Sequence, residues 1–194
     1  VQSAPHPDAA KERSAELLKA ARQASRLANQ LLSFERAAGS DLQHTTQSID
    51  FAQLVSETVG RFAEMHSAPN FEVLYTPPPH PVPVRGDPVM LRETILNLLD
   101  NAVVHGGAHM TRIQLRCEKT SQMAHLFLED NGIGIPKEKR IEVMMRFAQA
   151  KDGTGSGLGL AIASRVMGNH SGTIDILDTD RGTKIQLALP LASS

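Results

Sequence analysis

Residues 91–105 read LRETILNLLDNAVVH, and this stretch decides how the rest of the sequence is interpreted. At the periodicity of an α-helix, apolar side chains occupy one face: Leu91, Ile95, Leu98, Leu99 and Ala102. Another face repeats a polar residue at every fourth position: Glu93, Asn97, Asn101 and His105. A polar stripe of this kind is usually solvated. Two asparagines four residues apart, however, also offer a column of amides that could bind a metal–phosphate group without adding negative charge.

Length and composition limit the classes of protein that need to be considered. The chain has 194 residues, 41% hydrophobic and 21% charged, which is enough for one globular core and an appendage. A formal net charge of -1 argues against a dedicated nucleic-acid binder. The sequence has neither an apolar run of membrane-spanning length nor a signal-peptide pattern, so we expect it not to enter a membrane. The single cysteine, Cys117, excludes an internal disulfide and a cysteine-based zinc site.

The first part of the chain predicts one long helix over residues 8–38. Its apolar residues keep a three–four spacing: Leu17, Ala20, Ala24, Leu27, Leu31, Phe34 and Ala38. Asp8 can cap the start of this helix, and Gly39 with Ser40 can stop it. The stripe favours packing against another helix or dimerisation over ligand binding. The polar residues that follow place a domain boundary near residues 39–47.

The remaining sequence predicts alternating strands and helices. Strands are expected near Ile49 and over residues 71–75, 113–117, 124–130, 172–178 and 183–189. Helices are expected over residues 51–66, 138–145 and 157–168, besides the helix quoted above, which Pro88 would start. Residues 76–83, TPPPHPVP, are too rich in proline for a helix or a central strand and predict an exposed connection.

Two glycine-containing segments carry the strongest chemical signals. One predicted strand ends in Asp130-Asn-Gly132-Ile-Gly134-Ile135. Residues 153–160, GTGSGLGL, lack the lysine of a phosphate-binding P-loop and the glycine spacing of a dinucleotide-binding turn. They instead predict a glycine loop that runs into a helix N-terminus, where free backbone N–H groups and the helix dipole attract phosphate.

Taken in order, these motifs resemble those of a known family. The order is Asn97-x-x-x-Asn101, Asp130-x-Gly132-x-Gly134, Phe147 and Gly155-x-Gly157-Leu158-Gly159-Leu160. It resembles the N, G1, F and G2 boxes of the catalytic and ATP-binding domain of histidine kinases, whose fold is shared with gyrase and mismatch-repair ATPases. The resemblance covers roughly residues 48–191.

The resemblance implies a fold and a domain organisation. The implied fold is α+β, a two-layer α/β sandwich of a mixed sheet and helices, preceded by one long helix. Residues 48–194 would be the catalytic ATP-binding domain. Residues 1–39 look like the second helix of the hairpin that these kinases use for dimerisation and phosphotransfer, so the hairpin would be incomplete.

The resemblance also implies roles for individual residues. Asn101 would be a ligand of the Mg2+ that bridges the ATP phosphates, and Asn97 would support that site. Asp130 would accept a hydrogen bond from the adenine amino group, with Thr183 nearby through a water. The glycines would allow close approach of the backbone to the base or fold a lid over the phosphates: Gly132, Gly134, Gly155, Gly157 and Gly159. The remaining residues of the implied nucleotide site are His105, Ile135, Phe147, Ser156, Leu158 and Leu160.

The sequence departs from the family pattern at informative positions. Val104 stands where a phosphate-binding lysine is common, so His105 would act alone or with lid cations such as Arg146 and Lys151. Related ATPases have a glutamate that activates water at the Asn97 position, and an amide cannot act as a general base. Met144 replaces a common aromatic residue. His6 lies between prolines and outside any acceptor motif, so the phosphoacceptor histidine is expected to lie outside this chain, which begins with Val and suggests a fragment.

The expected function is the ATP-binding catalytic core of a bacterial two-component sensor histidine kinase, which transfers the γ-phosphate of ATP to a histidine. Its expected partners are ATP, a response regulator protein and a second copy in the full-length protein. The expected location is the cytoplasm, either alone or as part of an inner-membrane sensor. Two alternatives stay open: a serine kinase of the anti-sigma-factor type, and an interaction module that binds nucleotide without kinase activity.

Overall fold

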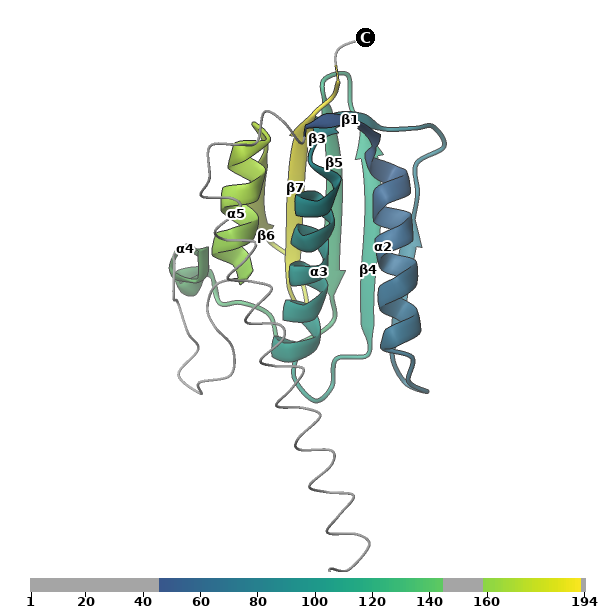
Figure 1. Cartoon of the computed structure of the whole chain (residues 1–194). Coiled ribbons are helices and arrows are strands. Elements are labelled where there is room, and N and C mark those ends of the chain that lie inside the picture. Colours follow the sequence, from purple (N-terminus) through teal and green to yellow (C-terminus); the bar gives the residue numbers. More distant parts are fainter. Residues whose placement is uncertain (1–45, 145–158, 193–194) are drawn as a thin grey trace, which may run out of the picture.

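The computed structural model describes residues 46–144 and 159–192, which form a two-layer sandwich (Figure 1). One layer is a five-stranded sheet in the order β2-β4-β5-β7-β6. Only β2 and β4 are parallel, and the other neighbouring strands are antiparallel. The strands are β2 (Glu72–Thr76), β4 (Arg112–Lys119), β5 (Met123–Asp130), β6 (Thr173–Leu177) and β7 (Lys184–Pro190). The predicted fold class, a mixed sheet backed by helices, is confirmed.

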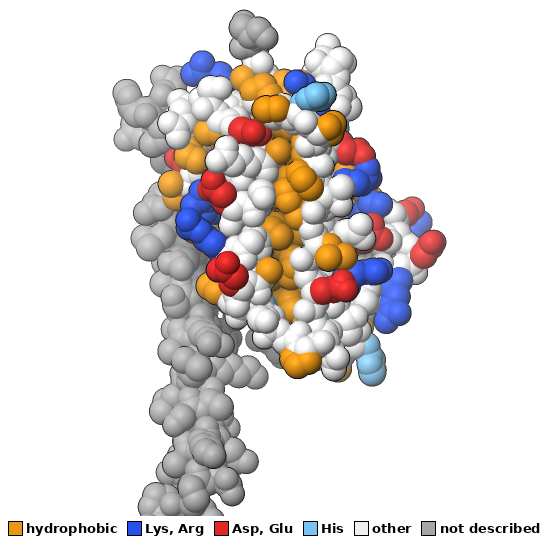
Figure 2. Space-filling view, turned by 90° about the vertical axis from the view of Figure 1, so that its right-hand side faces the viewer, with side chains coloured by type: hydrophobic (Ala, Val, Ile, Leu, Met, Phe, Trp, Pro, Cys, Tyr) orange, Lys and Arg blue, Asp and Glu red, His pale blue; other side chains and the backbone are white. Residues whose placement is uncertain are grey.

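The other layer consists of helices α2 (Phe51–Met65), α3 (Pro88–His105) and α5 (Gly159–Asn169), which cover one face of the sheet (Figure 1). Strand β4 shows why the layers adhere. Its residues Ile113, Leu115 and Cys117 are at most 3% exposed, whereas the residues between them are exposed. Burial of such an apolar face is the main stabilising contribution to the sandwich. Figure 2 looks onto the side with α2 and β2 and shows a strip of hydrophobic side chains between charged ones.

Helix α3 begins and ends where the sequence predicts. The Asp87 carboxylate accepts hydrogen bonds from the backbone N–H groups of Val89 and Met90 at 2.8 and 3.1 Å, and Pro88 occupies the first helical turn. These contacts satisfy N–H groups that the first turn of a helix otherwise leaves unpaired. At the other end, the Gly106 N–H donates to the Ala102 carbonyl at 2.8 Å.

One local prediction holds only in part. Residues 76–83 were expected to be an exposed connection, and residues 77–81 are one, but Val82 is fully buried and β3 (Pro83–Gly86) follows it. Strand β3 pairs with β1 (Gln47–Asp50), in a register that places Val84 opposite Ile49. The proline-rich run masked a short strand because a proline is tolerated at the first position of a strand at a sheet edge.

The short elements before the second gap differ slightly from expectation. A 3-10 turn (Lys137–Lys139) leads into α4 (Arg140–Met144), where one helix had been predicted over residues 138–145. The predicted helix over residues 8–38 lies outside the described residues, so it and the domain boundary near residues 39–47 stay predictions. Among the helices of the described part, none combines the length and the apolar character needed to cross a bilayer.

Candidate functional site

The polar stripe of α3 points Asn97 into the protein rather than into solvent. Asn97 is 6% exposed, and its Nδ2 atom has no hydrogen-bond partner among the described residues. A buried amide N–H without a partner costs about 1–3 kcal/mol, so such groups usually meet a ligand or an ordered water. This buried, unpaired donor is therefore the first sign of a binding site on α3.

Asn101 lies one helical turn further along α3 and contacts the start of α5. A Cβ atom on Gly159 would lie 2.7 Å from Nδ2 and 3.0 Å from Oδ1 of Asn101. A side chain at this position would push the Asn101 amide away, so the close approach of α5 to Asn101 depends on glycine. The contact brings the asparagine amide beside the N-terminal end of a helix, where the helix dipole favours negative charge.

Asp130, the last residue of β5, is the buried acid of the site. It is 4% exposed, and its Oδ1 accepts hydrogen bonds from the backbone N–H groups of Gly132 at 2.8 Å and Thr183 at 3.3 Å. Burial raises the pKa of the Asp130 carboxyl above its usual value, and the hydrogen bonds from Gly132 and Thr183 offset part of this shift. Asp130 forms no ion pair with any described residue, so no described cation competes with a ligand for its carboxylate.

Glycines shape the chain around Asp130. Gly132 packs on Gly106 at the end of α3: a Cβ atom would lie 2.5 Å from the Gly106 carbonyl oxygen. Gly134 has φ +75° and faces Gly182, whose own φ is +76°. A side chain on Gly182 would run into the backbone carbonyl of Asp130. The predicted site includes Gly132 and Gly134, and the structure adds Gly106 and Gly182 to it.

The other predicted site residues fall into two groups. Within the described part, His105 is exposed at the end of α3, and Ile135, Leu160 and Thr183 are half-buried. The Thr183 N–H contact places this residue beside Asp130, as the sequence suggested. The following residues lie outside the described part: Phe147, Gly155, Ser156, Gly157 and Leu158, together with the lid cations Arg146 and Lys151 and with His6.

The donor set fits Mg2+ only as part of a nucleotide complex. Among residues 46–144 and 159–192, no group of three or more His, Cys, Asp and Glu side chains could hold a metal ion. At Asn101 the ion would take one amide oxygen from the protein and its remaining ligands from phosphate and water. This is the usual way in which proteins bind Mg2+ with nucleotides, because the ion loses its waters reluctantly.

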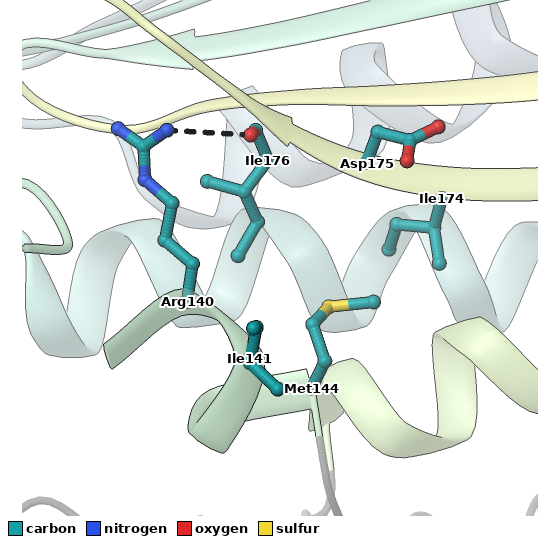
Figure 3. A pocket seen from close by; sticks show the side chains of 6 residues that line it. All are labelled: Arg140, Ile141, Met144, Ile174, Asp175 and Ile176. Atoms are coloured by element: carbon teal, nitrogen blue, oxygen red, sulfur yellow. Dashed lines mark hydrogen bonds between the residues drawn. The ribbon is translucent and has the colours of Figure 1, made fainter. Parts of the chain in front are cut away.

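A separate hollow of about 390 Å³ lies between α4 and β6 (Figure 3). Its described lining is mostly apolar and consists of Arg140, Ile141, Met144, Ile174, Asp175 and Ile176. The Arg140 guanidinium spans its edge and donates to the Ile176 carbonyl at 3.5 Å. Since these residues include none of the predicted nucleotide site, we do not assign nucleotide to this hollow.

Comparison with known proteins places the chain in a family. Residues 86–193, more than half of the chain, match the family described as Histidine kinase-, DNA gyrase B-, and HSP90-like ATPase. The chain belongs to this ATPase family. It is also 34% identical over 149 residues to the probable sensor histidine kinase TcrY of Mycobacterium tuberculosis (strain ATCC 25618 / H37Rv), a match that covers 74% of this chain. The chain spans about a third of the length of such relatives, namely 30% of TcrY.

Solved structures of this ATPase family have the same fold. The ATP binding domain of PrrB from Mycobacterium tuberculosis is 28% identical, with a TM-score of 0.65, and the match covers 77% of this chain and 99% of that one. The mycobacterial sensor histidine kinase MprB is 32% identical, with a TM-score of 0.61, and the match covers 76% of this chain and 99% of that one. The predicted resemblance to the ATP-binding domain of sensor histidine kinases is thereby confirmed.

Proposed function

We propose that this chain binds Mg2+ and ATP and acts as the catalytic core of a bacterial two-component sensor histidine kinase. The observation that carries the proposal is the pairing of a buried, cation-free acid at the end of β5 with the Asn97–Asn101 column of α3. The first can recognise the base of a nucleotide, and the second can support its phosphates. One nucleotide could then bind with its base at the end of β5 and its phosphates along α3.

Each protein group has a defined task in this proposal. The Asp130 carboxylate accepts a hydrogen bond from the adenine amino group and so selects adenine over a base that presents a carbonyl there. The Asn101 amide oxygen holds Mg2+, which would neutralise charge on the transferring phosphoryl group. The buried Asn97 Nδ2–H donates to a phosphate oxygen or to a water at the same place.

The amide at position 97 also favours transfer to protein over hydrolysis. An asparagine side chain cannot remove a proton from water at neutral pH, so the site lacks a general base at this position. Catalysis then depends on positioning and charge neutralisation, and the nucleophile is a histidine that we expect outside this chain. A response regulator would receive the phosphoryl group next, and the full-length protein would act in the cytoplasm as a homodimer.

Calorimetric titration with a non-hydrolysable ATP analogue tests the site. We expect Mg2+-dependent binding by the unaltered chain and a loss of about tenfold or more in affinity for Asn101→Ala, because one of few direct ligands is removed. Gln114→Ala is the matched control, since Gln114 is an exposed amide on the opposite face of the sheet. Absence of binding by the folded, unaltered chain would refute the kinase assignment and favour an interaction module.

A further inference from the structure

The nucleotide site occupies only one end of the packing between α3 and α5, and the other end holds a buried histidine. His170 directly follows α5 and is 9% exposed. Its Nε2 accepts a hydrogen bond from the backbone N–H of Asp87 at 3.0 Å, and its Nδ1 lies 2.7 Å from the Val166 carbonyl. Because Asp87 donates to Nε2, the ring proton must sit on Nδ1, where it donates to Val166.

The ring is held tightly in this position. A Cβ atom on Gly86 would lie 2.8 Å from Cδ2 and 3.2 Å from Nε2 of His170, so the imidazole packs directly on the backbone of Gly86. The chain turns sharply after the ring: Ser171 has φ +55°, and the Gly172 N–H donates back to the Met167 carbonyl at 2.8 Å. This left-handed turn closes the C-terminus of α5 and fixes where His170 can reach.

Helices α3 and α5 are therefore antiparallel and joined at both ends. At one end Gly159 packs on the Asn101 amide, and at the other His170 binds the N-cap of α3 through Asp87. Between these ends α5 contributes small or apolar buried residues: Ala161, Ile162, Ala163, Val166 and Met167. The hydrophobic effect is itself non-directional, so a hydrogen bond to a fixed backbone N–H adds a directional constraint on the axial position that apolar burial alone does not supply.

We infer that His170 is a positioning residue that sets the axial register of α5 on α3 and thereby the packing contact between Gly159 and the Asn101 amide. Helix α5 transmits the constraint over roughly 16 Å, the length of 11 residues at 1.5 Å each. The same residue thus tunes the affinity of the nucleotide site without touching nucleotide. This inference rests on the proposed nucleotide site for its effect on binding, but its structural part, the register, is independent of any ligand.

Two substitutions distinguish the hydrogen bond that His170 accepts from Asp87 from the one that it donates to Val166. In His170→Gln, the amide oxygen lies the same number of bonds from Cα as Nε2 and can still accept from Asp87. In His170→Asn, the amide nitrogen can replace only Nδ1, so the link to α3 is lost. A third variant, Gly86→Ala, keeps the histidine but presses on its ring and on the buried Leu91 side chain, whose Cδ1 would lie 2.7 Å from the new Cβ, so its result is interpreted only together with that of His170→Asn.

The experiment measures the Kd of a non-hydrolysable ATP analogue with Mg2+, together with the NMR signals of the Asn101 side-chain amide and the Gly159 backbone amide in the ligand-free chain. We expect His170→Asn and Gly86→Ala to raise Kd about tenfold, as when only about a tenth of molecules are binding-competent. His170→Gln should stay within about threefold of the unaltered chain. The two amide signals should shift in the first pair and not in His170→Gln.

Each outcome decides the question. Equal Kd values and unshifted amide signals in folded His170→Asn would overturn the positioning role. Unfolding of both His170→Asn and Gly86→Ala would assign the link to global stability and also overturn it. If the unaltered chain binds no nucleotide, the proposed function fails, and the two amide signals alone then support or overturn the register. Rescue in His170→Gln would support positioning, because loss of bulk alone cannot explain it.

Discussion

Two aspartates, Asp130 and Asp178, lie at the same end of the sheet, where β5 and β6 finish, and have opposite environments. Strands β5 and β6 both pair antiparallel with β7, and Glu129 of β5 and Leu177 of β6 both lie opposite Lys184. Asp130 ends β5, is buried, and accepts hydrogen bonds from Gly132 and Thr183 without a described cation beside it, whereas Asp178 follows β6, with its side chain 66% exposed. The Asp178 carboxylate pairs with Arg140 at 2.7 Å and Lys137 at 2.8 Å.

The difference shows which acid can serve a ligand. Both oxygens of Asp178 are taken by cations, and these contacts tie the 3-10 turn and the start of α4 to the end of β6. Asp130 has no described cation beside it, and desolvation is the dominant influence on its carboxyl. A buried acid that the protein leaves without a counter-charge is costly unless a ligand uses it, and such groups therefore mark functional sites.

The largest expected effect comes from Gly182, which lies four residues after Asp178 in the sequence and packs against the Asp130 carbonyl. Gly182→Ala should reduce the free energy of unfolding by about 2 kcal/mol or more, because φ +76° is strained for alanine and the new Cβ meets backbone. Urea denaturation measures this loss. Gly60→Ala is the control: no atom lies within 4 Å of its new Cβ, and helix propensity predicts a gain of up to about 1 kcal/mol. Equal effects of the two substitutions would contradict the close packing at Asp130.

The second effect compares the two acids directly. Asp130→Asn should weaken binding of the ATP analogue by about tenfold, since hydrogen bonds to charged groups contribute about 1.5–3 kcal/mol. Asp178→Asn should leave the affinity unchanged, because the Asp178 carboxylate contacts cations of the protein and is exposed. Calorimetry on both variants decides the comparison. A similar loss in both would show that the outer acid also shapes the site.

The sequence predicted much of the structure around Asp130, because the pattern of residues within a single strand was enough to orient this side chain. Alternation of buried residues through Ala124, Leu126 and Leu128 leads in step to Asp130, so its inward orientation followed from the period of a strand. The family resemblance also implied that Thr183 lies near Asp130, and the structure joins the two residues through a hydrogen bond. Periodicity and caps likewise predicted α3 within a few residues.

Contacts between distant segments escaped prediction. The partners of Asp178 lie about 40 residues before it, and nothing local in the sequence indicates that they meet. Burial of Asn97 escaped for a similar reason: a polar stripe is normally solvated, but here α3 lies between α2 and α5 in the helical layer (Figure 1). The link from His170 to Asp87 joins residues 83 positions apart, and a single histidine after a helix gives no hint of it.

The smallest expected effect is a difference in pH dependence between the two acids. Burial raises the pKa of Asp130 above its ordinary value of 3.8, so between 3.8 and that raised pKa the folded chain holds a proton that the unfolded chain has lost. The contribution of Asp130 to stability is therefore greatest below pH 3.8 and is lost as pH rises through the raised pKa. Hydrogen bonds from Lys137 and Arg140 hold the pKa of Asp178 below 3.8, so its contribution is present above pH 3.8 and is lost as pH falls through the lowered pKa.

Urea denaturation from neutral to acid pH can separate these signs, because titration of the other carboxyls is shared and cancels between each variant and the unaltered chain. On acidification, the unaltered chain should gain stability relative to Asp130→Asn and lose stability relative to Asp178→Asn. Because Asp178 is exposed, its ion pairs are screened by salt, and its difference should shrink at high ionic strength. The difference for Asp130 should persist at high salt, since desolvation rather than a charged partner is its main cause. Parallel pH curves for the two variants would mean that the two strand ends share one electrostatic environment and that Asp130 is not set apart for a ligand.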